Sequence, residues 1–383
     1  MKKKIRLTIL LVCVGCFFVI TPVLVAYSMG YRFDFQKMKI TATGGIYVRT
    51  FPAADQIIID SKITQKPGMF SNSIFVQSLL PNEHAVLVKK TSYYDYFKTL
   101  PVQEKEVTKI ENVLLFKKDI QFTIITDKTK SPFITQEKFL IKNNNLYYSD
   151  APENSELTVV QKSTPVLKKI AAFALSPFGG SPVGRQNNNI IWLGTDGFLY
   201  KSDLSASPAA EPAKIILTPL KIVKTGSYKI ISDSKNIFIN NNGNLLFLNT
   251  KTNELDDFAG QVKDAKISPD DKNIVYFSGK NLYIFLLSKE SDGKVLLYKS
   301  PEEITDCIWL NNDYIIISSA NKIIISEIDY RGNINAVTLP QTINISSAEK
   351  IEIKNPEIFF NRQDAKLYIL TGKTLLSSEK LTP

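Results

Sequence analysis

The sequence predicts an all-β protein that follows a single N-terminal transmembrane helix. Three observations predict this class. Residues 7–29 form an uncharged apolar run, residues 44–118 read as short alternating strands separated by turn residues, and a turn-and-strand motif recurs after residue 119. Almost no helical periodicity follows the apolar run. The chain of 383 residues has room for two or three domains.

The apolar run, LTILLVCVGCFFVITPVLVAYSM, has 23 residues. At about 1.5 Å per residue it spans roughly 35 Å, which is enough for the core of a bilayer. Four cationic residues precede it, so the positive-inside rule predicts a cytoplasmic N-terminus and an extracytoplasmic remainder. We expect a basic tip and anchor over residues 1–30 and a juxtamembrane linker over 31–43. The predicted anchor residues are Leu7, Leu11, Phe17, Phe18 and Leu24.

A cleaved signal peptide is the alternative for this segment. Ala26-Tyr27-Ser28 offers small residues at suitable spacing for cleavage. The length of the run favours an uncleaved anchor, and so do Tyr27, Tyr31 and Phe33 with Arg32, which look like an interfacial belt. Both interpretations export the rest of the chain.

The charge and cysteine content of the chain exclude two kinds of interaction. The formal net charge is +10, but four of these charges lie at residues 2–6 and the rest are spread thinly, so no nucleic-acid partner is expected. Cys13 and Cys16 lie in the apolar run, which leaves Cys307 as the single thiol of the exported part. An internal disulfide is therefore excluded there, and the fold must depend on its core.

Residues 44–118 predict a small β-sandwich. Ile46, Val48 and Thr50 alternate with polar and aromatic positions, and Pro52 ends that strand because it cannot donate to a ladder. About six or seven strands fit into this stretch. The stretch resembles the PEGA domain, a small extracytoplasmic β-sandwich family. The residues that carry the resemblance fall in the family's order: Gly45, Pro52, Ile57, Ile59, Asp60, Leu80, Pro81, His84, Val86, Val88 and Tyr93.

The departures from the PEGA pattern lie at turns. Ala54 and Asp55 replace a Gly-Ala pair, Ser61 replaces the glycine after Asp60, and Asn82 replaces the glycine of the Leu-Pro turn. Asn, Asp and Ser are common substitutes at such positions. The resemblance covers about a fifth of the chain and implies a surface or envelope module that spaces the following domain from the lipid.

The range 119–383 contains six copies of a turn followed by an apolar strand. They are NNNLYYSD, DGFLYKSD, NGNLLFLN, GKNLYIFL, ANKIIISE and GKTLLSSE, anchored on Leu146, Leu199, Leu245, Leu282, Ile323 and Leu375. A spacing of roughly 45 residues fits one four-stranded blade per repeat. We expect a second strand before each copy, as in IIWLGT or EIFFNRQ, and an exposed loop at residues 179–189.

Two repeats carry an earlier element too, AFALSPFGG at residues 172–180 and AKISPDDKNIVYF at residues 265–277. The second has a strand, a Ser268-Pro269-Asp270-Asp271 turn and another strand, and this order resembles WD-repeat-like propellers of the periplasmic type. The chain therefore predicts a β-propeller of about six blades, within five to seven. Seven blades would result if residues 117–128 or a terminal strand closed the ring.

The search for chemistry predicts no catalytic, cofactor-binding or metal site. His84 is the single histidine, which excludes multi-histidine zinc sites and lacks the spacing of a catalytic triad. Thr371-Gly372-Lys373-Thr374 lacks the first glycine of a phosphate loop, because Leu367 stands there. The pairs Asp256-Asp257 and Asp270-Asp271 read as blade turns. Arg185, Arg331 and Arg362 are unranked ligand candidates, and the aromatic cluster at residues 93–97 reads as core, with carbohydrate or peptide stacking as the alternative.

These observations together predict a non-catalytic, single-pass surface protein of the cell membrane. Its propeller would bind or scaffold a cell-envelope protein or polysaccharide. The alternatives are an exported hydrolase or lyase with a propeller active site, and an envelope assembly factor.

Overall fold

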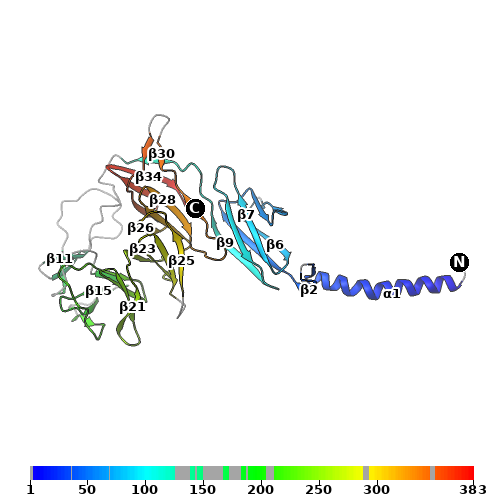
Figure 1. Cartoon of the computed structure of the whole chain (residues 1–383), viewed down its shortest axis with the longest axis horizontal. Coiled ribbons are helices and arrows are strands. Elements are labelled where there is room, and N and C mark those ends of the chain that lie inside the picture. The colour runs from blue at the N-terminus through cyan, green and yellow to red at the C-terminus, as the bar shows by residue number, and fades with distance from the viewer. Residues whose placement is uncertain are drawn as a thin grey trace. The chain divides into compact units, whose positions relative to one another are not determined.

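The structure is a computed structural model, and it describes residues 3–35, 37–68, 70–125, 139–142, 145–149, 167–171, 183–186, 189–203, 211–287, 293–345 and 350–383. Outside the N-terminal helix, the secondary structure is almost entirely β (Figure 1). The chain divides into two compact units. Unit 1 holds residues 1–120, 329–335 and 382–383, and unit 2 holds residues 121–328 and 336–381.

The first element is helix α1, Lys3–Ser28, which contains Pro22. The stretch Ile9–Ser28 is long and apolar enough to cross a membrane, and none of it is buried against the protein. Leu11, Phe17, Phe18 and Leu24 all expose more than half of their surface. Leu7 lies in the helix, but its side chain is outside the described set. A helix of this kind near the N-terminus fits a membrane anchor or a signal sequence.

A two-stranded hairpin follows the helix. Strand β1, Tyr31–Asp34, pairs antiparallel with β2, Lys39–Ala42. It occupies the segment expected to be a linker, and Figure 1 shows β2 beside the C-terminal end of α1.

Two facing sheets make the body of unit 1. Their strand orders are β6-β3-β9 and β5-β4-β7-β8, with β3 and β9 parallel. Alternate residues of each sheet turn inward, as Ile46 and Val48 of β3 and Val86 and Val88 of β7 do, and they share one apolar core. The strands are β3 (Gly44–Phe51), β4 (Gln56–Ile59), β5 (Ile63–Gln65), β6 (Ser73–Leu79), β7 (Glu83–Lys89), β8 (Tyr96–Pro101) and β9 (Val107–Leu114).

Residues 329–335 complete unit 1, although they fall inside the continuous range 119–383 expected for the propeller. They lie along β8, where Asn333 accepts a hydrogen bond from the amide of Thr99 (2.9 Å) and donates one to the carbonyl of Phe97 (2.7 Å). Gly332 has a φ of +63°, and a Cβ there would collide with the carbonyl of Thr99, so the position requires glycine.

Lys98 anchors this loop from beneath. Its side chain is fully buried, and its ammonium donates to the carbonyls of Asp329 (2.6 Å) and Asn333 (3.1 Å). Burial of the Asp329 carboxyl acts to raise its pKa, but the hydrogen bond from Arg331 and the charge of Lys98 outweigh that effect, so its pKa lies below the usual range. The buried charge is thus compensated by the loop.

Unit 2 is a series of antiparallel sheets in chain order. Their strand orders are β11-β12-β13, β14-β15-β16-β17, β18-β19-β20-β21, β22-β23-β24-β25, β26-β27-β28-β29 and β10-β34-β33-β32, and β30 and β31 form a separate hairpin. The first strands β14, β18, β22, β26 and β32 lie next to one another in that order. The strands are β10 (Phe122–Ile124), β11 (Phe139–Lys142), β12 (Asn145–Ser149), β13 (Leu167–Ala171), β14 (Val183–Gln186), β15 (Asn189–Leu193), β16 (Leu199–Asp203), β17 (Ala213–Lys214), β18 (Tyr228–Ser232), β19 (Ile237–Asn241), β20 (Asn244–Asn249), β21 (Glu254–Ala259), β22 (Asp264–Ile267), β23 (Asn273–Ser278), β24 (Asn281–Leu286), β25 (Lys294–Lys299), β26 (Ile304–Trp309), β27 (Tyr314–Ser319), β28 (Lys322–Glu327), β29 (Ala336–Thr338), β30 (Thr342–Asn344), β31 (Lys350–Glu352), β32 (Glu357–Asn361), β33 (Lys366–Thr371) and β34 (Thr374–Lys380).

The recurring sequence motif marks the same position in each four-stranded sheet. Leu199, Leu245, Leu282, Ile323 and Leu375 are each the first or second residue of the third strand, counted from the first-strand side. Leu146 lies in β12, so the motif assigns β11, β12 and β13 to the second, third and fourth positions of a sheet. The turn at each copy fixes the preceding hairpin, which explains the period.

Two local expectations were wrong. EIFFN is β32, the first strand of the last sheet, and the strand directly before its motif is β33. Residues 183–186 are the first strand β14 rather than an exposed loop, and Gly184 is needed there because a Cβ would lie 2.6 Å from Ile230. Residues 122–124, which belong to the range considered for a seventh blade, form β10, the outer strand of the last sheet. The segment at 172–180 lies outside the described residues.

Pairing of β10 with β34 joins the two ends of unit 2. Phe122 stands opposite Ser378, and Ile124 stands opposite Leu376. The strand that enters unit 2 first is therefore held by the strand that leaves it last.

We expect Lys98→Met to destabilise unit 1 by about 2–4 kcal/mol, because it leaves the loop carbonyls of Asp329 and Asn333 without the donor that the buried lysine supplies. Denaturant unfolding of the full chain in detergent, with hydrogen exchange of the β8 amides, measures this. Lys109→Met is the matched control: its side chain is 62% exposed and lies 3.8 Å from Glu111. Equal effects of the two substitutions would contradict the role given to Lys98.

Candidate functional site

The structure brings three residues of the PEGA-like motif together. Nδ1 of His84 lies 2.6 Å from a carboxylate oxygen of Asp60, and Nε2 lies 2.7 Å from the carbonyl oxygen of Leu80. The second carboxylate oxygen of Asp60 accepts the amide of Ala85 (2.9 Å). Both ring nitrogens thus face acceptors, and His84 is buried. These hydrogen bonds hold the end of β4 against β7 and against the turn before β7. They give His84 a structural role in the sandwich.

The other residues of that motif do not join this cluster. Gly45 lies in β3, Pro52 follows the end of β3 across a cis peptide bond, and Pro81 lies in the turn before β7. Tyr93 packs against the sandwich core and forms an isolated bridge with Lys117.

The expected turn residues of the propeller lie between β22 and β23. The hydroxyl of Ser268 donates to Asp270 (2.6 Å) and accepts the amide of Asn273 (2.9 Å). Pro269 sits between them, and Asp271 adopts a left-handed φ of 57°. Asp271 also accepts a hydrogen bond from Ser234 (2.9 Å). The turn is therefore tied to the neighbouring sheet, next to the cleft described below.

Charged side chains on the first strands of neighbouring sheets neutralise one another. Lys229 pairs with Asp264 (2.6 Å), and Lys266 pairs with Asp306 (2.6 Å) and with Asp264 (3.9 Å). Burial acts to lower the pKa of Lys266, but the charges of Asp306 and Asp264 and the hydrogen bond to Asp306 act with the other raising contributions, and together they raise the pKa. Beside this row, burial raises the pKa of the Cys307 thiol to about 12. Cys307 is therefore a poor nucleophile, because the thiolate is the reactive form.

A cleft of about 430 Å³ in unit 2 is lined by residues of two adjacent sheets, β14 to β17 and β18 to β21. We call it the lysine cleft. Its lining residues are Gln186, Lys201, Lys214, Ile215, Ile216, Leu217, Ser234, Lys235, Ile237, Leu248, Thr250 and Asn253. No carboxylate is among them.

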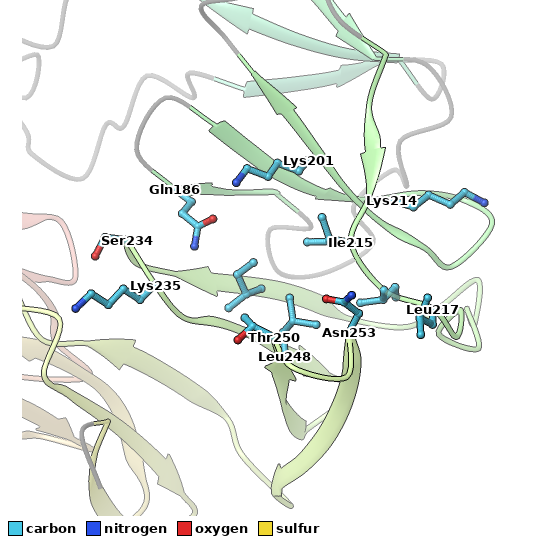
Figure 2. Close-up of a pocket in the computed structure, with 12 residues that line it drawn as sticks. Gln186, Lys201, Lys214, Ile215, Leu217, Ser234, Lys235, Leu248, Thr250 and Asn253 are labelled. Atoms are coloured by element: carbon cyan, nitrogen blue, oxygen red, sulfur yellow. The ribbon is translucent and has the colours of Figure 1, made fainter. Parts of the chain in front are cut away.

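Two of its three lysines have no ion-pair partner within the part of the chain that the structure describes. Lys214 forms a long ion pair with Asp196 (3.8 Å) and a cation–π contact with Phe198, whose ring centre lies 3.7 Å from the ammonium. Among the described residues, neither Lys201 nor Lys235 has a carboxylate within ion-pair distance. Figure 2 shows Lys201 and Lys235 on facing walls, while the ammonium of Lys214 points away from them.

The floor of the lysine cleft is apolar. Ile216, Ile237 and Leu248 are buried there, and the amides of Gln186 and Asn253 add hydrogen-bonding groups at the rim. Cations beside an apolar floor suit a ligand that carries an anionic group and an apolar part. This arrangement can bind and orient such a ligand.

The sequence did not rank these lysines. The chain has 47 lysines and arginines, and Lys201 and Lys235 carry no motif that separates them from the others. Their proximity depends on the packing of one sheet against the next. Of the arginines considered earlier, Arg331 binds Asp329 (2.8 Å) and the carbonyl of Lys109 (2.9 Å), and Arg362 has its pKa lowered by burial. The side chain of Arg185 is outside the described set.

Two further sequence features can be placed. In the aromatic cluster, Tyr96 is a core residue, Tyr93 and Tyr94 are half-buried, and Phe97 is 45% exposed beside the loop 329–335. Within the described residues, no group of three His, Cys, Asp or Glu side chains could hold a metal ion.

Comparisons with known proteins show likeness in fold only. No family model matches the chain, and no curated protein matches it. Among solved structures, it is similar to a chain of the mitotic checkpoint complex, with 11% identity and a TM-score of 0.42 over 79% of this chain and 86% of that one. It is also similar to the β-propeller domain of Cps50 (Swd1) from Myceliophteria thermophila, with 10% identity and a TM-score of 0.39 over 77% and 92%. A third likeness is to BamB from Moraxella catarrhalis, with 9% identity and a TM-score of 0.38 over 78% and 82%.

We expect the double substitution Lys201→Glu/Lys235→Glu to weaken binding of a polyanion such as dextran sulfate about a hundredfold, because each lysine contributes a charge-assisted hydrogen bond of about 1.5 kcal/mol and the double variant loses both. Titration of the full chain in detergent measures this. Lys224→Glu/Lys299→Glu, at exposed lysines outside the cleft, changes the net charge equally and should leave binding nearly unchanged. Equal losses in both double variants would contradict a localised site.

Proposed function

We propose that this protein is a single-pass, membrane-anchored extracytoplasmic binding protein without catalytic activity. Its PEGA-like sandwich holds a β-propeller away from the lipid, and the propeller binds or scaffolds a cell-envelope partner. The observation that carries the proposal is α1, an apolar helix that is not covered by any described part of the protein and is followed by two β units.

The direction of insertion follows from charge. Lys2, Lys3, Lys4 and Arg6 precede the apolar stretch, and the positive-inside rule keeps such residues on the cytoplasmic side. Both β units follow the helix and are then extracytoplasmic.

The propeller assignment rests on the sheets of unit 2. Four-stranded antiparallel sheets follow one another, their first strands lie side by side, and β10 completes the last sheet. A ring of six blades closed by β10 and β34 accounts for this order, because closure leaves only short protected edges.

Binding rather than catalysis is supported by how the reactive groups are used. His84 is held between Asp60 and Leu80, and the pKa of Cys307 is raised. The lysine cleft offers cations, amides and an apolar floor, which are binding groups. We infer that the envelope partner, a protein or a polysaccharide, presents anionic groups to this cleft.

An uncleaved anchor predicts that the mature protein keeps its N-terminal segment and stays in the membrane fraction after washing with alkaline carbonate. Mass spectrometry of the purified protein should recover peptides from residues 7–29. Recovery of a soluble mature chain that begins near residue 29 would contradict the anchor and support the signal peptide.

A further inference from the structure

The hairpin β1–β2 exposes large apolar side chains and buries polar ones, which is the opposite of the usual arrangement in water. Its exposed side chains are large and apolar: Phe35 exposes 80% of its surface, Met38 73%, Ile40 69% and Phe33 42%. Phe33 stands opposite Ile40 in the strand pairing, and its ring packs edge-on against Phe35 at 5.0 Å. These four residues, which we call the apolar face of the hairpin, form one continuous patch.

Two polar side chains of the same hairpin, those of Arg32 and Thr41, contact the sandwich. Arg32 donates to the hydroxyl of Ser78 (3.2 Å), and Thr41 donates to Glu104 (2.5 Å). Asp34 and Thr41 are buried. A strand alternates its faces, so binding the polar face to the protein necessarily presents the apolar face outward.

The turn of the hairpin is held as well. The ammonium of Lys37 donates to the side chain of Asn82 (2.9 Å) and to the carbonyl of Pro81 (3.3 Å). Three separate polar contacts therefore fix the hairpin on the sandwich, and the apolar face is presented by a supported element.

The hairpin is also held at the end of α1. The carbonyl of Gly30 accepts the amide (2.9 Å) and the hydroxyl (2.7 Å) of Thr43, which closes the segment between the helix and the hairpin. Arg32 lies over the ring of Tyr27 at 3.5 Å and donates to the carbonyl of Tyr27 (2.7 Å). Arg32, expected to face the membrane interface, is instead turned onto the helix end and the sandwich.

We propose that the apolar face of the hairpin rests in the interfacial layer of the bilayer, around the point where α1 leaves it. The occupant of this surface is lipid. Tyr27 and Met29 at the end of α1 are exposed as well, and Tyr31 is only three residues beyond Ser28, so the hairpin cannot lie far from the lipid that surrounds the helix. The inference rests on the proposed membrane anchor and adds a second, peripheral contact that sets the orientation of the sandwich on the membrane.

Tryptophan quenching tests this contact in the full chain reconstituted into vesicles that contain lipids brominated near the headgroup end of the acyl chains. We expect the tryptophan of Phe35→Trp to lose at least half of its emission relative to unbrominated vesicles. The native Trp192 and Trp309 are buried and supply a baseline from the parent chain. A second variant, Ile40→Trp, keeps the test open if the first fails to fold.

Phe70→Trp is the matched control. Phe70 is 99% exposed and lies before the Ser73 end of β6, whereas the hairpin binds Ser78 at the opposite end of that strand. Its tryptophan should be quenched no more than the parent baseline. Flotation of the same vesicles separates the two proposals. Protein that does not float refutes the anchor, whereas protein that floats with Phe35→Trp and Ile40→Trp both unquenched refutes the hairpin contact alone. Quenching of all three variants alike would also refute it.

Discussion

The apolar surface of α1 is not covered by any described part of the protein. The organisation of the chain depends on which apolar environment removes that surface from water. The described stretch Ile9–Ser28 is apolar and uncovered, and such a helix is stable in an apolar environment because its backbone hydrogen bonds are satisfied within the helix. The next element meets the same constraint, since the hairpin binds the sandwich through its polar side chains and leaves Phe35 and Ile40 outward. The ordinary rule, apolar inside and polar outside, returns only with the sandwich core.

Unit 2 is subject to a different constraint, because the first and last sheets of a row each have a neighbour on one side alone. Each sheet leaves an exposed edge, and neighbouring sheets need each other to bury their faces. Taking β10 from the beginning of the unit as the outer strand of the last sheet ties both ends together. The balanced row Lys229, Asp264, Lys266 and Asp306 lets first strands approach closely without an uncompensated charge.

Features that depend on local periodicity could be predicted from the sequence, and features that depend on distant packing could not. The alternation at Ile46 and Val48 and the motif at the start of each third strand follow from strand geometry and turn chemistry. The pairing of β10 with β34 joins Thr123 to Ser377, 254 positions apart, and the loop 329–335 contacts the buried Lys98, which is far away in sequence. Gly184 looked like a loop residue because its constraint comes from Ile230 of the next sheet. The lysine cleft was missed for the same reason, since Lys201 and Lys235 meet only when two sheets pack.

The proposed function depends most on whether the two β units lie outside the cytoplasm. Labelling of intact cells with a membrane-impermeant amine reagent, read out by mass spectrometry, tests it with the chain's own lysines. If the β units are extracytoplasmic, the reagent should modify the exposed Lys224 and Lys299 in intact cells. It should modify Lys2, Lys3 and Lys4 only after the cells are permeabilised. Labelling of the N-terminal lysines in intact cells, with Lys224 and Lys299 protected, would contradict it.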